Sequence, residues 1–154
     1  MRARCLVLCA LVFVTAVHAQ TPAQTSELRS YRVVDDTIAA SLTGQGGNAG
    51  RGALLLQQRQ KSLCVLCHSG PFPDTHLQGT IAPDLTGVAS RFSAAQLRLR
   101  IVDMKRLNPQ SIMPTYYAVA AESGARVAAN WRGKPILSAE EIEDLVAYLQ
   151  TLKQ

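Results

Sequence analysis

The sequence has few aromatic residues, since Phe, Trp and Tyr together make up 5% of its 154 residues. It also lacks any long stretch in which apolar and polar residues alternate, so a sheet-based fold is not expected. Basic residues form no long run, which argues against nucleic acid as a partner. These absences leave one small helical domain, with a core that needs apolar volume beyond its own aromatic side chains.

Residues 1–19 have the pattern of a secretory signal peptide. Arg2 and Arg4 give a cationic start, an apolar run extends from Cys5 to Val17, and small residues precede the expected cleavage after Ala19. The apolar run is too short to span a bilayer. We therefore expect an exported protein that works outside the cytoplasm and has no membrane span after this segment is removed.

Cleavage changes both the cysteine count and the charge. Of the four cysteines, Cys64 and Cys67 remain, and 14 basic against 11 acidic residues leave a formal charge of about +3. Residues 20–47 are expected to form an N-terminal extension, whose apolar piece at 31–42 packs on the domain. That domain is expected to occupy residues 48–154.

Helix starts are marked by residues that cap the first turn. Ser93 and Ser138 each precede a Gln or Glu three residues later, which is the pattern of a capping box. Apolar residues then recur with a helical period, whereas the proline- and glycine-rich stretch 69–92 is expected to be a loop. We predict helices after Asn48, Ser93 and Ser138, at residues 49–60, 94–107 and 140–152.

The motif Cys64-Val65-Leu66-Cys67-His68 has the Cys-x-x-Cys-His spacing of c-type haem attachment. Two residues between the cysteines let both sulfurs reach the vinyl groups on one edge of a porphyrin, and the histidine that follows is placed under the iron. A thioredoxin-like pair would need an α/β chain, and a structural zinc site would need a second pair of ligands. A short disulfide would give His68 no role. The motif therefore predicts one covalent haem c, which also supplies the missing apolar volume.

Three residues are candidates for the second axial ligand of the iron. Met113 lies in an irregular loop between two prolines and has no helical face to fill. Met104 lies on the apolar face of a predicted helix, where methionine is usually part of the core. His76 follows His68 on a short tether and would have to reach the opposite side of the ring. We favour Met113, because His/Met ligation suits an electron carrier; an open site is the remaining alternative.

The second ring nitrogen of an axial histidine usually donates to a carbonyl, which orients the imidazole. The proline-stiffened loop at residues 81–88 is at a suitable distance along the chain from His68. We expect the carbonyl of Pro83 to accept this hydrogen bond.

Two groups of residues have open roles at the haem propionates. Tyr116, Tyr117 and Trp131 would either bond the propionates or pack at the domain edge, and packing is favoured. Arg91 and Arg98 are further candidate partners for the propionates.

The order of these motifs resembles that of class I cytochromes c. A capped helix leads into CVLCH, followed by APDLTGV, by IMP and by a last helix ending in AYLQTL, so that the resemblance covers residues 48–154. It implies an all-α class I cytochrome c fold with an N-terminal extension. It also implies that His68 and Met113 ligate the iron, and that the first and last helices cross near the haem edge.

A narrower resemblance runs from about Tyr31 to the C-terminus. The segments LCVLCHSGPFPDTHLQGTIAPDLTGV, QLRLRIVDMKRLNPQSIMPTYY and WRGKPILSAEEIEDLVAYLQTL are similar to those of the SoxX family, the monohaem subunits of the sulfur-oxidising SoxAX complex. The resemblance implies a periplasmic partner of SoxA, another c-type cytochrome. It implies that the pair couples thiosulfate oxidatively to a cysteine of the carrier SoxYZ, and that the small subunit passes electrons to a soluble cytochrome c.

The motif alone does not separate three functions. The first is the electron-transfer subunit of such an enzyme, with no nucleophile of its own because the haem consumes Cys64 and Cys67. The second is a free-standing electron shuttle, for which a strong charge patch would be more usual than this mildly charged chain. The third is a haem-based ligand sensor, which needs Met113 to be unligated.

Overall fold

The computed structural model describes residues 28–118 and 134–154, so the expected signal peptide and Trp131 lie outside the described residues. The described part is helical, and its one β-type pairing is an isolated bridge between Val34 and Thr37. This confirms the expected all-α class. Its elements are α1 (Ala49–Leu56), α2 (Cys64–Cys67), η1 (Thr75–Leu77), α3 (Val88–Arg91), α4 (Ala94–Asp103), η2 (Met104–Arg106) and α5 (Ala139–Leu149).

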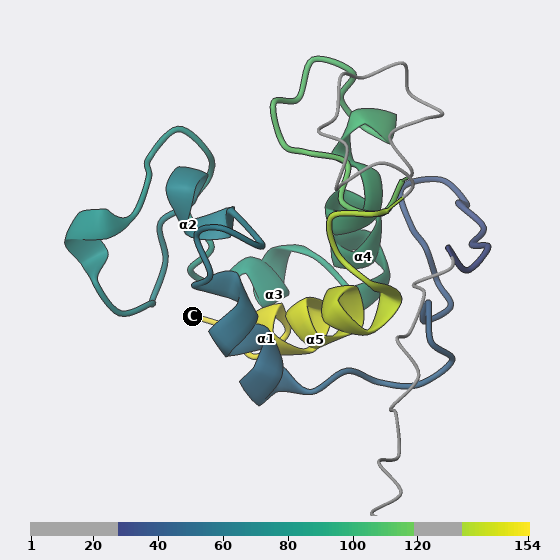
Figure 1. The fold of residues 1–154 in the computed structure, drawn as a ribbon, viewed down its shortest axis with the longest axis horizontal. Helices are drawn as coiled ribbons and strands as arrows, with labels where there is room; N and C mark the ends of the chain where they lie inside the picture. Colours follow the sequence, from purple (N-terminus) through teal and green to yellow (C-terminus); the bar gives the residue numbers. More distant parts are fainter. Residues whose placement is uncertain (1–27, 119–133) are drawn as a thin grey trace, which may run out of the picture.

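Helix α5 is the centre of the fold, because both α1 and α4 pack against it (Figure 1). The contact with α1 is close: a Cβ on Gly52 would lie 2.0 Å from the carbonyl oxygen of Asp144. Only glycine therefore fits at this crossing. The Asp144 carboxylate accepts hydrogen bonds from Asn48 N and Arg51 Nε, both at 2.6 Å, and so ties the start of α1 to α5.

All three predicted helix starts are confirmed to within one residue, but each predicted helix extends past the observed end. The last helix, predicted to reach residue 152, ends at Leu149. Asn48 caps α1, which ends at Leu56 and so falls short of residue 60. The helix predicted at 94–107 divides into α4 and η2, because Asp103 leaves helical dihedral angles with φ −159° and its side chain accepts from Lys105 N. The Ser93 and Ser138 capping boxes are both complete.

The stretch 69–92, expected to be a loop, contains two short elements, η1 and α3. Helix α3 follows Gly87, whose φ of +64° favours glycine, and it buries Val88. The longest helix of the described residues is α5, and none of them is long and apolar enough to cross a bilayer.

The core is built from apolar side chains of α1, α4 and α5 together with residues before α1. In the segment 31–42, Ile38 and Leu42 are buried, in agreement with the expected apolar contact. Fully buried side chains of the other elements meet them: Leu56 of α1, Leu99 and Val102 of α4, Leu137, and Ile142 and Leu145 of α5.

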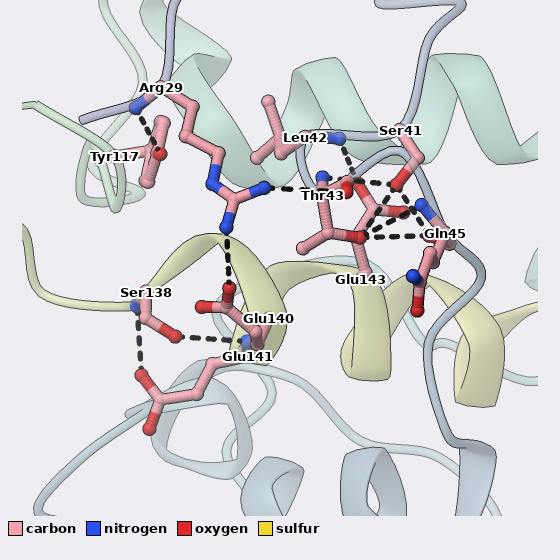
Figure 2. A network of polar contacts seen from close by, with 10 residues as sticks. All are labelled: Arg29, Ser41, Leu42, Thr43, Gln45, Tyr117, Ser138, Glu140, Glu141 and Glu143. Carbon is pink, nitrogen blue, oxygen red and sulfur yellow. Dashed lines mark hydrogen bonds and ion pairs between the residues drawn. The ribbon is translucent and has the colours of Figure 1, made fainter. Parts of the chain in front are cut away.

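A buried ion pair joins α4, α5 and the N-terminal segment. The Arg98 guanidinium donates to both carboxylate oxygens of Glu143, at 2.7 and 2.9 Å, and to the carbonyl of Ile38 at 2.7 Å. Glu143 in turn accepts from Leu42 N at 2.9 Å (Figure 2). Attraction alone does not offset the cost of burying two charges. The hydrogen bonds that both groups make in addition contribute to the stability of such a pair.

We expect Arg98→Met to lower the free energy of unfolding by about 3–5 kcal/mol, because it leaves the Glu143 charge buried without its partner. Arg29→Met is the matched control, since Arg29 pairs with Glu140 while their side chains are 54% and 57% exposed. That pair should contribute only about 0–1 kcal/mol. Urea unfolding of the three proteins measures both losses, and similar losses in the two variants would contradict the prediction.

Candidate functional site

The Cys-x-x-Cys segment forms a single helical turn, α2, and His68 follows it directly. Residues three apart on a helix share a face, so Cys64 and Cys67 lie on one side of α2, and neither is in a disulfide. His68 leaves the helix with φ −101° and ψ 137°, while its backbone N–H still donates to Cys64 O at 2.9 Å. The imidazole is therefore presented from the point where the turn ends.

The entry to this turn is fixed from the side of α1. Ser62 is fully buried, and its hydroxyl donates to the carbonyls of Leu55 and Leu56, the last residues of α1, at 2.7 and 3.1 Å. Leu63 then has a φ of +62°, a region that residues with a bulky side chain rarely adopt. The sharp change of direction between α1 and α2 is thus held by Ser62.

The loop after α2 folds back on the motif at Gly79. The N–H of Gly79 donates to Val65 O at 2.9 Å, and a Cβ on Gly79 would lie 2.0 Å from Leu66 O. In Figure 1 this loop, which carries η1, extends to the left of α2. The close approach of the two backbones requires glycine and brings the following residues, 82–85, alongside 67–69.

His68 Nδ1 lies 2.7 Å from the carbonyl oxygen of Pro83. A carbonyl only accepts hydrogen bonds, so Nδ1 carries the proton and Nε2 keeps its lone pair for another partner. Two backbone bonds flank this contact: Ala82 N donates to Cys67 O at 3.0 Å, and Leu85 N donates to Ser69 O at 2.9 Å. The imidazole is oriented by a paired segment rather than by one isolated carbonyl.

Asp84 reinforces this pairing through its side chain. One carboxylate oxygen accepts from Ser69 Oγ at 2.6 Å and the other from Thr86 N at 2.7 Å. These hydrogen bonds, aided by the positive charge of Arg91, lower the pKa of the Asp84 carboxyl to about 2. Arg91 also donates to the carbonyls of Asp84 and Thr86, both at 2.8 Å. The carboxylate is therefore ionised over the whole ordinary pH range and holds the loop in place.

Met113 lies in the irregular segment after η2, as expected from the sequence. It is half-buried and packs against the hydrophobic core, as Cys64 does. The two other ligand candidates are placed differently: His76 is exposed within η1, and Met104 is half-buried at the start of η2.

The favoured packing role of two tyrosines is confirmed. Tyr116 and Tyr117 are 3% and 2% exposed. The hydroxyl of Tyr116 donates to Ser62 O, and that of Tyr117 accepts from Arg29 N at 2.7 Å (Figure 2). Burial raises the pKa of the Tyr116 hydroxyl well above its usual value.

The propionate role suggested for Arg98 is wrong, because its guanidinium is buried in the ion pair with Glu143. From sequence alone, an arginine in a helix is expected to lie at the surface. The partner of Arg98 is 45 residues away, so the neighbouring sequence gives no sign that Arg98 is buried. Arg91 is the last residue of α3, and its guanidinium donates to two carbonyls of the loop that orients His68.

The residues of this site fit a covalent haem. Two unbridged thiols, an imidazole with a free Nε2 and a thioether form the donor set of a His/Met cytochrome c. Large apolar side chains in these segments are also exposed. They are Leu66 in α2, Leu77 and Ile81 in the loop after it, and Ile112 beside Met113.

The sequence analysis missed two contacts of this site. The Ser69–Asp84 hydrogen bond joins residues 15 positions apart, and only the turn that Asp84 forms with Thr86 N has a local signal. The Tyr116–Ser62 bond joins residues 54 positions apart and has no local signal.

Comparison with known proteins agrees with this geometry. The family described as cytochrome c matches residues 51–153. Among solved structures, a chain of the crystal structure of SoxXA from P. pantotrophus is similar, with 36% sequence identity, a TM-score of 0.72, and coverage of 80% of this chain and 95% of that chain. A search of curated proteins gives no match. These findings confirm the resemblance stated from the motifs.

We expect the contribution of Asp84 to stability to depend on pH. The pKa of its carboxyl is about 2 in the folded protein and 3.8 ordinarily. The stabilisation is therefore complete above the ordinary value and is lost as the pH falls through the folded value. The thermal unfolding midpoints of the wild type and Asp84→Ala should differ at about pH 6 and converge near pH 2.

Ser69→Ala is the control, because it removes one of the two donors to the same carboxylate and should give a smaller gap with the same pH dependence. A gap between the wild type and Asp84→Ala that stays constant with pH would mean that the side chain acts through packing.

Proposed function

The chain belongs to the cytochrome c family, and we propose that it carries one covalent haem c as the electron-transfer subunit of a SoxXA-type complex. The observation that supports this most is the arrangement of Cys64, Cys67 and His68. In it, His68 Nδ1 donates to Pro83 O and Nε2 is left free. The 36% identity to a chain of a SoxXA structure supports the assignment to that complex.

In this proposal Cys64 and Cys67 would hold the porphyrin covalently through their sulfurs, and His68 Nε2 and the Met113 sulfur would bind its iron. When bound, the haem would supply an iron that is reversibly reduced and oxidised by one electron. The thioether of Met113 is a weak donor that favours the reduced state, so it raises the potential. Burial of the ring among apolar side chains would act in the same direction.

The partner in this proposal is a SoxA-type cytochrome, with which the chain couples thiosulfate oxidatively to a cysteine of the SoxYZ carrier. Cys64 and Cys67 are both used for attachment, so the sulfur chemistry belongs to the partner. This chain accepts electrons from the partner's haem and passes them to a soluble cytochrome c. In this proposal residues 1–19 are a signal peptide that is cleaved after Ala19, and the chain works in the periplasm.

Replacing Met113 tests the ligand assignment. We expect Met113→His to abolish the long-wavelength absorption band that marks methionine bound to ferric iron. It should also lower the reduction potential by on the order of 0.1 V, within the range of about 0.8 V that axial ligands span. Met104→Leu is the control and should change neither quantity. Both proteins should keep the mass of one covalent haem, and an unchanged band in Met113→His would remove Met113 from the iron.

Size-exclusion chromatography of the native protein tests the complex. The proposal predicts that the chain elutes together with a second c-type cytochrome, which spectra and intact masses of the fractions identify. Elution as a monomer free of any second cytochrome would instead favour a free-standing electron shuttle. The two functions share the same residues at the iron, so this measurement separates them where spectra cannot.

A further inference from the structure

One buried hydrogen bond links the segment of Met113 to the attachment motif. Tyr116 follows Met113 by three residues, and its hydroxyl donates to the carbonyl oxygen of Ser62, two residues before Cys64. Both Tyr116 and Ser62 are buried, at 3% and 0% exposure. The bond therefore joins the two halves of the proposed haem site inside the protein, away from water.

The Ser62 end of this bond is a fixed point. The Ser62 hydroxyl donates to Leu55 O and Leu56 O, which anchors the residue to the end of α1. Its carbonyl accepts from the Cys64 thiol at 3.5 Å as well as from Tyr116. Thioether formation would consume the Cys64 S–H. Of these two donors to the Ser62 carbonyl, only the Tyr116 hydroxyl would then remain in the haem-loaded protein.

The Tyr116 end is anchored on the other side of the site. Thr115 Oγ1 donates to Asp103 Oδ1 at 2.9 Å, and Tyr117 N donates to Val102 O at 3.3 Å. The Tyr116 carbonyl accepts from Leu137 N at 3.1 Å. The backbone after Met113 is thus tied to α4 and to the entry of α5, while the Tyr116 side chain reaches back to Ser62.

We propose that Tyr116 is a positioning residue that holds Met113 at a set place relative to Cys64 and His68, and so stabilises the methionine-bound iron. This inference rests on the proposed function, because it needs Met113 as a ligand. It goes further by proposing that the strength of this ligation depends on a hydroxyl that bonds the backbone next to the attachment motif.

Tyr116→Phe tests the inference, because it keeps the ring in the core and removes only the hydroxyl. Tyr117→Phe is the matched control: it also removes a buried tyrosine hydroxyl, but one that bonds Arg29 of the N-terminal segment. The probe is imidazole, added to the ferric haem-loaded proteins, where it displaces methionine and abolishes the methionine band. Its apparent Kd measures how firmly Met113 is held.

Loss of the Tyr116 hydroxyl leaves the buried Ser62 carbonyl without this donor and so weakens the hold on Met113. Because imidazole competes with Met113 for the iron, we expect it to bind Tyr116→Phe about tenfold more tightly than the wild type. Tyr117→Phe should stay within about twofold of the wild type. The reduction potential of Tyr116→Phe should also fall, because the thioether favours the reduced state.

Two results would overturn the inference while leaving the proposed function intact. One is an unchanged imidazole affinity in Tyr116→Phe, even if urea unfolding shows that the variant is less stable. The other is an equal gain in affinity for both tyrosine variants, which would indicate general loosening. A wild-type protein without the methionine band would instead overturn the assignment of Met113, and the inference with it.

Discussion

The site depends on a single helical turn that has no core of its own. Helix α2 is four residues long, too short to be stable by itself, and of its residues only Val65 is buried. Its position is therefore imposed from both ends: Ser62 fastens its start to α1, and the pairing of 82–85 with 67–69 fastens its end. Two thiols and an imidazole thus have defined places without support from a long helix. A covalent group attached there would inherit the same placement.

In the rest of the fold, too, the helices and the irregular segments have different roles. The crossing of α1 and α5, made close by Gly52, gives a rigid base on which the polypeptide around the haem can stay irregular. The buried pair of Arg98 and Glu143 fastens the N-terminal segment to this base through the backbone at 38 and 42. Rigidity is thereby concentrated in the helices, and the segments around the proposed iron ligands are held by a few specific hydrogen bonds.

How far the sequence predicts this structure follows from the range of each interaction. The capping boxes at Ser93 and Ser138 act within one turn, so three or four letters suffice to find them, and the spacing of the motif identifies the haem in the same way. Helix ends were predicted poorly, because Asp103 breaks a periodic pattern that continues past it. Arg98 was misjudged and the Tyr116–Ser62 bond missed for one reason: their partners lie 45 and 54 residues away, and only the folded chain shows them.

Electron transfer makes modest demands on a protein, and the structure is arranged to meet them. The iron must change its charge without a rearrangement of its ligands, since any movement on reduction would slow the transfer. In the proposed site, the His68 imidazole fixed through Nδ1 would meet this requirement for one iron ligand. The other proposed ligand, the Met113 thioether, lies in an irregular segment and would be free to move unless something outside the segment restrained it. In our proposal the buried Tyr116 hydroxyl supplies that restraint from a residue that is already packed in the core. Rigidity at the iron would then need no additional ordering of the surface.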